Sequence, residues 1–347
     1  MMVIFGNRQI LYTAVFRAII RAIFVTFPGF MAVLLTVTLS MGMAAYASAA
    51  GLGTRDQNPL LQRFYLPTLN PSENSGWQSS HLFLATNTYQ RDASPSEFLE
   101  MDVEMYRYDL SIGYQWDQWR LTATTALISY QSGALDEVID SFHQFFNLPE
   151  GGRPNNPNDR INLDYRKNGL VVFSQDFRDS GLGDLAISLS KKIWATDTAA
   201  TEISVGVELP AGELSVYGDN SGVDTAFWIT HNWIINPTMS VFGLLGRSYL
   251  ETGGIFNDQI KDYVKFLQFG CEYRITEQVS AVVQFDFHSP IIKDSTLNAL
   301  GKSAQIQTGF KVSDWVEGYD VDLFVSEDIK IGSAPDVSFG LGFTKRY

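Results

Sequence analysis

The sequence predicts an all-β fold, an antiparallel transmembrane β-barrel, and three observations lead to it. Long segments alternate between apolar and polar residues, tight turns alternate with long loops, and the last segment alternates up to a terminal aromatic residue, Tyr347. The composition agrees, because the 347 residues include 24 Phe, 15 Tyr and 7 Trp but only 18% charged residues. Such a mix is typical of a β-rich protein with much apolar surface.

The alternation is clearest in the segment 106–114. Successive side chains of a strand point to opposite faces, so this segment puts tyrosines and aliphatic residues on one face and polar residues on the other. The same pattern predicts strands at 80–90, 106–114, 118–130, 182–194, 201–209, 222–234, 238–249, 262–274, 279–287, 304–310, 318–329 and 335–347. Most are about 10 to 13 residues long, which suits a tilted membrane-crossing strand better than a soluble one.

A secreted β-sandwich also has alternating strands, so it is the competing interpretation. Two features favour the barrel. The polar faces carry full charges and small residues, as a wet barrel interior does. The last strand, which ends at Tyr347, resembles the C-terminal strand that the barrel-assembly machinery recognises in bacterial outer-membrane proteins. A closed sheet is also the only strand architecture that satisfies all its backbone groups within a bilayer.

The first 49 residues have the three parts of a secretory signal peptide. Arginines precede an apolar run over 22–39, and small residues follow, with A-x-A cleavage sites ending at Ala47 or Ala49. An uncleaved membrane anchor is the alternative. We therefore expect a signal peptide at 1–49, an N-terminal periplasmic segment at 50–78, a barrel at 79–347, and location in the bacterial outer membrane.

Turn parity limits the number of strands to 12 or 14. If the C-terminus is periplasmic, the tight turns at 115–118, 195–200, 236–238, 274–278 and 313–318 all fall on the periplasmic side. Zero or two further strands then fit into the long extracellular excursion 131–181. Zero gives 12 strands, whereas splitting 161–177 at Asn168-Gly169, a strong hairpin signal, gives 14. The arms of that hairpin are short for crossing a membrane, so we expect 12 strands with 14 as the alternative.

The segment 134–146 predicts an amphipathic helix within this extracellular excursion. Leu135, Val138, Ile139, Phe142 and Phe146 share one helical face. Together with the motif 141–153 (SFHQFFNLPEGGR), the segment Gly181-Leu-Gly-Asp184 and the segment Leu209-Pro-Ala-Gly212, this block resembles a family of uncharacterised Gram-negative outer-membrane β-barrels, known as a domain of unknown function. The resemblance covers most of the mature chain, and it implies a barrel without implying a reaction.

Charged side chains on the predicted inner faces are the candidates for a lumen or constriction that selects solutes. Three lie in or after the helix, namely Asp140, His143 and Arg153. The others are predicted on strands: Arg107, Asp109, Glu202, Glu208, Asp286, His288, Lys311, Asp320 and Asp322. The competing interpretation is an internal network of salt bridges and hydrogen bonds that stiffens the barrel.

Several kinds of chemistry are excluded or disfavoured. A net charge of −13 argues against nucleic acid, and a single cysteine, Cys271, excludes disulfides and multi-thiolate metal sites. The four histidines are scattered, and no phosphate-binding loop or G-x-S-x-G motif is present. We therefore expect no cofactor, no metal and no enzymatic activity.

Three functions remain open. The leading one is a narrow channel or uptake protein for small molecules. The second is an outer-membrane lipid hydrolase, built on Asp140-Ser141-x-His143, although residues two apart on a helix do not face each other. The third is a structural or surface-interaction barrel without transport. The expected partners are outer-membrane lipid and lipopolysaccharide, the barrel-assembly machinery, and a small-molecule solute of unknown identity.

Overall fold

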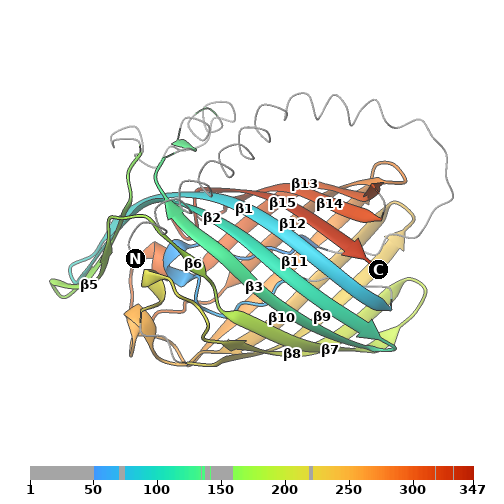
Figure 1. Cartoon of the computed structure of the whole chain (residues 1–347), viewed down its shortest axis with the longest axis horizontal. Helices are drawn as coiled ribbons and strands as arrows, with labels where there is room; N and C mark the ends of the chain where they lie inside the picture. Colours follow the sequence, from blue (N-terminus) through green and yellow to red (C-terminus); the bar gives the residue numbers. More distant parts are fainter. Residues whose placement is uncertain are drawn as a thin grey trace, which may run out of the picture. The chain divides into compact units, whose positions relative to one another are not determined.

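Twelve antiparallel strands close into a barrel in the computed structural model (Figure 1). The structure describes residues 51–69, 75–133, 135–136, 141, 159–218, 222–316, 318–330 and 332–347. Each strand pairs with its neighbours around the ring, and β15 pairs with β1 to close it. The ring strands are β1 (Gly76–Ala93), β2 (Glu97–Trp116), β3 (Trp119–Gln131), β7 (Leu185–Ala195), β8 (Ala199–Leu209), β9 (Asp224–Asn236), β10 (Met239–Tyr249), β11 (Tyr263–Arg274), β12 (Val279–His288), β13 (Ser303–Val316), β14 (Tyr319–Asp328) and β15 (Val337–Arg346).

The predicted alternation is confirmed by the burial of the side chains. On the outer face, Leu245 and Phe227 are 57% and 56% exposed. On the inner face, Gln284 and Gln307 are fully buried. An apolar exterior around a polar interior is the reverse of a soluble protein, and it is the arrangement that lipid around the barrel requires. A soluble β-sandwich is therefore excluded.

Aromatic side chains form a girdle at the end of the barrel where the tight turns lie. They are large and outward-facing, and each lies at or next to the end of a strand: Trp77, Tyr114, Trp116, Trp194, Trp233, Tyr273, Trp315 and Tyr347. On β11, Tyr273 belongs to this girdle and Tyr263 lies at the opposite end of the strand. Ten residues at about 3.3 Å each, tilted by about 40°, span about 25 Å, which matches the apolar band of an outer-membrane barrel.

Strands β1 and β2 extend beyond the ring and build a lid. In β2 the alternation changes phase between Met105 and Tyr106. From Tyr106 to the end of the strand, the apolar side chains face outward. Before Tyr106, in the part of β2 nearer the lid, Leu99, Met101 and Val103 face inward and are 0–1% exposed. The change of phase marks where the strand leaves lipid and begins to cover a hydrophobic core.

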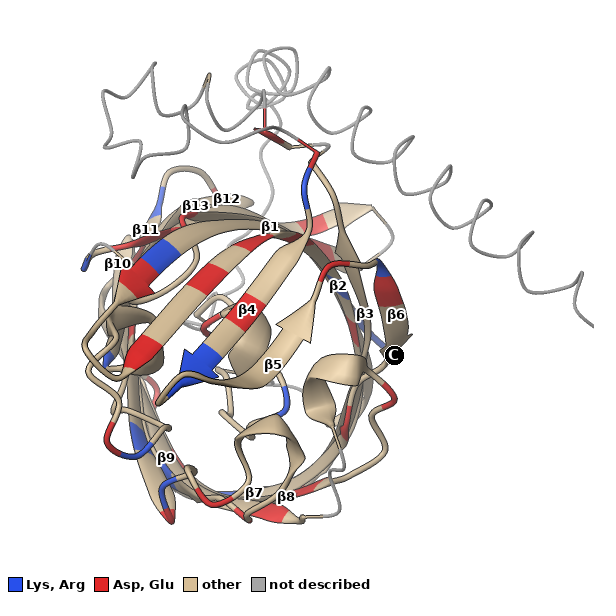
Figure 2. Cartoon of the chain, turned by 90° about the vertical axis from the view of Figure 1, so that its left-hand side faces the viewer, with Lys and Arg blue, Asp and Glu red and all other residues tan. Residues whose placement is uncertain are grey.

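Two short strands complete the lid, β4 (Asn162–Lys167) and β5 (Leu170–Gln175). β4 pairs with residues 97–102 of β2. In Figure 2, β4 and β5 run across the mouth of the barrel. The Tyr165 hydroxyl donates to Glu97 Oε1 at 2.8 Å, and its ring packs on Phe256 in the loop between β10 and β11. Burial and this hydrogen bond raise the pKa of Tyr165 well above its ordinary value, so the hydroxyl remains a donor.

The count of 12 strands is confirmed, and 14 is wrong. The hairpin predicted at Asn168-Gly169 exists, with φ angles of 53° and 78° at the two turn residues. Positive φ at both central positions is the geometry for which Asn-Gly is favoured. The hairpin adds β4 and β5 to the lid and not to the ring, because arms of six residues are too short to cross a membrane.

The segment 131–181 contributes one more strand, β6 (Asp179–Leu182). β6 and β7 pair with successive parts of the same strand, β3. The bend between β6 and β7 explains two of the sequence motifs. Asp184 Oδ1 accepts hydrogen bonds from the backbone N–H groups of Ala211 and Gly212, at 2.9 and 2.7 Å. The motifs at 181–184 and 209–212 thus hold one another in place.

The amphipathic helix predicted at 134–146 lies almost wholly outside the described residues. Short 3-10 turns occur elsewhere, namely η1 (Pro59–Leu61), η3 (Ser215–Tyr217), η4 (Gly254–Phe256) and η5 (Asn298–Leu300). None of the helices in the described part of the chain is long and apolar enough to cross a bilayer.

Candidate functional site: a plugged lumen with one polar wall

Residues 51–69, the plug segment, lie inside the barrel, and all but Gly53 and Thr68 are buried. Both ends of the segment are held halfway up the wall. Gln284 on β12 accepts from Leu52 N at 2.8 Å and donates to Leu52 O at 3.1 Å. Gln268 on β11 accepts from Leu69 N at 3.1 Å. Leu52 and Leu69, near the two ends of the described segment, therefore both lie at mid-height inside the lumen.

The middle of the plug segment reaches the long loops on the lid side of the barrel. Asn58 donates to Ala299 O at 2.8 Å, and the Arg63 guanidinium donates to the carbonyls of Gly253 and Glu251 at 3.1 and 3.2 Å. Apolar side chains of the segment, among them Leu60 and Phe64, join one core with the lid and the loops. The half of the lumen on the lid side is therefore filled.

Local interactions shape the plug segment. Asn58 accepts from Leu60 N at 3.0 Å and caps η1, in which proline occupies the first position. Arg55 donates to the carbonyls of Gln62 and Phe64, at 3.0 and 2.5 Å. These bonds satisfy backbone carbonyls that would otherwise be buried without a partner.

This location differs from the expected periplasmic segment at 50–78. Residues 51–69 lie in the lumen, and β1 begins at Gly76. The sequence of the plug segment is short and irregular, so it carries no periodicity that predicts burial. Its environment is created by the barrel strands that fold around it.

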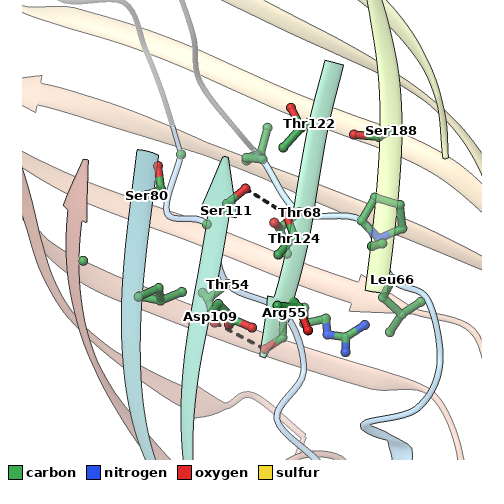
Figure 3. Close-up of a pocket in the computed structure, with 18 of the residues that line it drawn as sticks. Thr54, Arg55, Leu66, Thr68, Ser80, Asp109, Ser111, Thr122, Thr124 and Ser188 are labelled. Carbon is green, nitrogen blue, oxygen red and sulfur yellow. Dashed lines mark hydrogen bonds between the residues drawn. The ribbon is translucent and has the colours of Figure 1, made fainter. Parts of the chain in front are cut away.

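Below the plug segment, the described residues leave a hollow along one side of the lumen. A cavity of about 190 Å³ lies between the segment and the wall formed by β1, β2, β3, β7, β8 and β9. Hydroxyl groups line this polar wall (Figure 3): Ser80, Ser111, Thr122, Thr124, Ser188, Ser190 and Thr230. Several hydroxyls pair across strands, for example Ser111 with Thr124 at 2.8 Å. A smaller hollow, also lined by Ser80, Ser111 and Thr122, continues from this cavity toward the turn end.

Most of the predicted lumen charges face inward and form ion pairs. Arg107 and Asp109 lie 2.7 Å apart, and Glu202 lies 2.9 Å from Arg120. Near the turn end, Asp320 lies 2.7 Å from Arg346, and Lys311 lies 3.8 Å from Asp322. Each of these four cations has a carboxylate beside it, so the four pairs add little net charge to the lumen.

Two predicted lumen residues hold the plug segment. His288 Nε2 lies 2.9 Å from Asp56 Oδ2, and both side chains are 2% exposed. Asp286 accepts from Gln268 Nε2 at 2.8 Å, and the same amide donates to Thr54 O at 2.8 Å. These contacts support the interpretation of an internal network for this side of the lumen.

Glu208 stands apart from the paired charges. It faces inward from β8, lines the cavity and is 8% exposed. Its Oε2 atom is buried and has no hydrogen-bond partner within the described residues. A buried carboxylate oxygen without a partner is costly, so Glu208 is an incompletely satisfied group in this wall.

The constriction candidates Asp140, His143 and Arg153 lie outside the described residues, so the structure does not test them. Sequence reasoning also missed several residues that build the site, namely Arg55, Arg120, Gln268 and Gln284. The two glutamines had a signal, because each falls on the polar face of a predicted strand. In the described part of the chain, no group of three or more His, Cys, Asp or Glu residues is arranged to hold a metal ion.

Residues 30–347 match the family described as protein of unknown function, DUF3187. The chain belongs to this family. The resemblance seen in the sequence motifs is thereby confirmed. No curated protein matches the chain.

The comparison with solved structures finds outer-membrane barrels. The COG4313 outer membrane channel from Pseudomonas putida F1 aligns with a TM-score of 0.52 and 10% identity, over 80% of this chain and 100% of that one. The toluene transporter TbuX of Ralstonia pickettii gives 0.40 and 9%, over 88% and 97%. The translocator domain of the autotransporter NalP from Neisseria meningitidis gives 0.43 and 10%, over 79% and 90%. Only the first exceeds 0.5, and at 10% identity it shows a shared fold.

Proposed function

We propose that this member of the DUF3187 family is an outer-membrane channel that admits small polar, uncharged solutes along the hydroxyl-lined side of its lumen. The cavity between the plug segment and the polar wall carries the proposal. In this arrangement the aromatic girdle of Trp77 and Trp233 lies at the periplasmic face and the lid lies outside the cell.

The chemistry of the wall supports uncharged polar solutes. Ser and Thr hydroxyls both donate and accept, so they replace the water around a polyol or a small sugar at low cost. The fixed charges nearby are neutralised in pairs such as Arg120–Glu202, which weakens selection for either sign of ion.

Trp228 supplies an apolar platform in the same cavity. Its ring projects inward from β9 and meets the Tyr65 ring of the plug segment edge-on, with centroids 6.4 Å apart. Leu66 and Pro67 line the cavity from the side of the plug segment. A compartment with hydroxyls on one side and apolar surface on the other suits a solute with both C–H and O–H groups.

A pair of single-cysteine variants tests the route. Ser188 faces the cavity from β7, whereas its neighbour Ile187 belongs to the outer face. In a Cys271→Ser background, a charged thiol reagent should remove most of the single-channel current of Ser188→Cys in planar bilayers. Ile187→Cys is the matched control and should keep its current. Equal insensitivity of both variants, or a barrel that never conducts, contradicts the proposed function.

Liposome swelling tests the class of solute. Glycerol and a neutral monosaccharide should enter faster than glutamate or lysine of comparable size. A charged solute loses part of its hydration shell in the lumen, and wall charges that are already paired do not compensate for that loss. Faster entry of either ion would contradict the proposed preference.

A structural barrel without transport remains the second candidate, and one observation favours it. The plug segment and the lid together fill the extracellular half of the lumen with a continuous hydrophobic core that includes Leu60, Leu99 and Leu163. This candidate predicts that the barrel conducts no current in planar bilayers, even in a variant whose plug segment is released from the wall. The lipid-hydrolase alternative rests on Asp140, Ser141 and His143, and nothing in the described structure supports it.

A further inference from the structure

Two unpaired cations face each other on the outer surface of the barrel. Arg247 on β10 and Lys265 on β11 are direct cross-strand partners. They belong to the outward face, whose next residues toward the barrel centre are Leu245 and Leu267. Neither side chain forms an ion pair or a side-chain hydrogen bond with the described residues. Like charges directly opposite one another destabilise a sheet, and an anion bound between them would offset this repulsion.

Their depth places the two cations at the edge of the membrane. The next outward pair toward the lid is Tyr249 and Tyr263, whose rings lie 6.5 Å apart at the lid end of their strands. Arg247 stacks over the Tyr263 ring with its guanidinium carbon 4.4 Å from the centroid. Tyrosines at this position mark the interface between lipid tails and headgroups. The cationic groups therefore lie level with the phosphates of the leaflet on the lid side.

Among the described residues, no carboxylate of the loop on the lid side forms an ion pair with Arg247 or Lys265. Asp262, which directly precedes Tyr263, lies 3.3 Å from Lys293 Nζ and is 87% exposed. On the neighbouring strand, the residue opposite Arg247 is Phe227. The pair is thus enclosed by aromatic rings and open toward lipid.

We propose that Arg247 and Lys265 form a binding site for a phosphate group of lipopolysaccharide in the outer leaflet. Arg offers a planar fork of donors and Lys a mobile point charge, and together they match the oxygens and the negative charge of a phosphate monoester. Tyr249 and Tyr263 flank the site with rings that prefer the headgroup region. The site rests on the outer-membrane orientation proposed above, but it does not depend on transport.

The chain offers a matched control at the other end of the barrel. Lys191 lies over the Trp119 ring at 4.8 Å, and Lys345 lies over the Tyr319 ring at 4.5 Å. Both cations face outward near the tight turns. They share the cation-on-aromatic arrangement but lie in the periplasmic leaflet, away from lipopolysaccharide.

The experiment measures retention of lipids by the purified full barrel in detergent, by native mass spectrometry and by the shift of its heat-modifiable gel transition. The probes are bisphosphorylated lipid A, dephosphorylated lipid A and phosphatidylglycerol. Wild type should retain bisphosphorylated lipid A best, and Arg247→Gln/Lys265→Gln should bind it about tenfold more weakly. Lys191→Gln/Lys345→Gln should bind it as wild type does.

A variant that keeps its heat-modifiable gel transition has folded. Lys265→Gln alone changes one exposed side chain, so it is a less disruptive test of the same site. Unchanged lipid A binding by the double variant, or equal retention of phosphatidylglycerol by wild type, overturns the site. A barrel that conducts no current but still loses lipid A with these substitutions would refute only the proposed transport.

Discussion

His288 on β12 and Asp56 in the plug segment form a buried contact of 2.9 Å that joins the plug to the barrel wall. The other ring nitrogen of His288 donates to the carbonyl of Ser289 at 2.9 Å, because a carbonyl can only accept. The contact with Asp56 therefore involves the remaining nitrogen and one shared proton. No other ion pair described in the structure links the plug segment to a strand with both side chains so deeply buried.

Removing one member of this pair should release the plug segment. His288→Ala leaves a carboxylate buried without its partner, which costs about 3–5 kcal/mol in comparable buried pairs. We expect trypsin to cleave the detergent-solubilised variant after Arg55 or Arg63, at sites protected in wild type, and mass spectrometry of the fragments to show it. Replacing both residues, in Asp56→Leu/His288→Leu, should restore much of the protection.

The control for this prediction is an exposed ion pair. Asp262→Asn removes the partner of Lys293 at the barrel rim, where a surface pair contributes about 0–1 kcal/mol. Its trypsin pattern should match wild type. If His288→Ala is equally resistant, the buried pair does not hold the plug segment.

Gly212→Ala should destabilise the bend between β6 and β7. A Cβ atom at Gly212 would lie 2.1 Å from the Tyr217 ring, and Gly212 N is one of the two donors to Asp184. Overpacking of this kind costs about 1–3 kcal/mol. The heat-modifiable gel transition should move to lower temperature. Gly243→Ala, whose Cβ would meet its nearest neighbour at an ordinary 3.6 Å, is the control and should leave the transition unchanged.

Leu245→Arg tests the assignment of the outer face to lipid. Leu245 is 57% exposed, midway between the two ends of β10. An arginine at the bilayer midplane on the lipid face costs about 2–4 kcal/mol, whereas a soluble surface tolerates it. Folding titrations into lipid vesicles should show this loss, and Leu245→Ala should lose much less. Equal stability of the arginine and alanine variants would contradict a lipid-facing exterior.

Tyr347 should matter for assembly more than for the stability of the assembled barrel. It is 71% exposed, and its backbone N donates to Trp77 O at 2.9 Å across the closure of β15 on β1. The hydrogen bond survives a change of side chain. Tyr347→Ser should therefore lower the fraction of heat-modifiable protein in the outer membrane of cells while leaving the gel transition of the assembled fraction in place. A normal assembled fraction would exclude recognition of the terminal ring.

Asp184→Asn and Asp184→Ala should differ. The asparagine oxygen can still accept from the N–H groups of Ala211 and Gly212, whereas alanine leaves both donors without this acceptor. An unsatisfied buried donor costs about 1–3 kcal/mol, so only the alanine variant should unfold at clearly lower temperature. Equal transitions for both variants would show that the backbone donors find another acceptor.

Much of the barrel was predictable because lipid imposes a period of two on each strand. Outward residues such as Phe285 and inward residues such as Gln284 differ in polarity, and the sequence displays that difference directly. The pairing of Glu202 with Arg120 was not predictable, because it depends on which strands are neighbours and in which register. The prediction found the part of β2 from Tyr106 onward but missed residues 97–105. In those residues the apolar side chains occupy the inward positions, whereas from Tyr106 onward they occupy the outward ones.

The sequence by itself determined the ring strands, their inward and outward faces and the parity of the turns, since these follow from local patterning against lipid and water. Parity left 12 or 14 strands open, and the short arms of the hairpin at Asn168-Gly169 favoured 12. The tertiary structure alone decided that residues 51–69 fill the lumen, that β4 and β5 form a lid, and that a polar cavity remains beside Glu208. Those features depend on contacts such as Leu52 with Gln284, more than two hundred residues apart, and no periodicity in one segment can specify such a pairing.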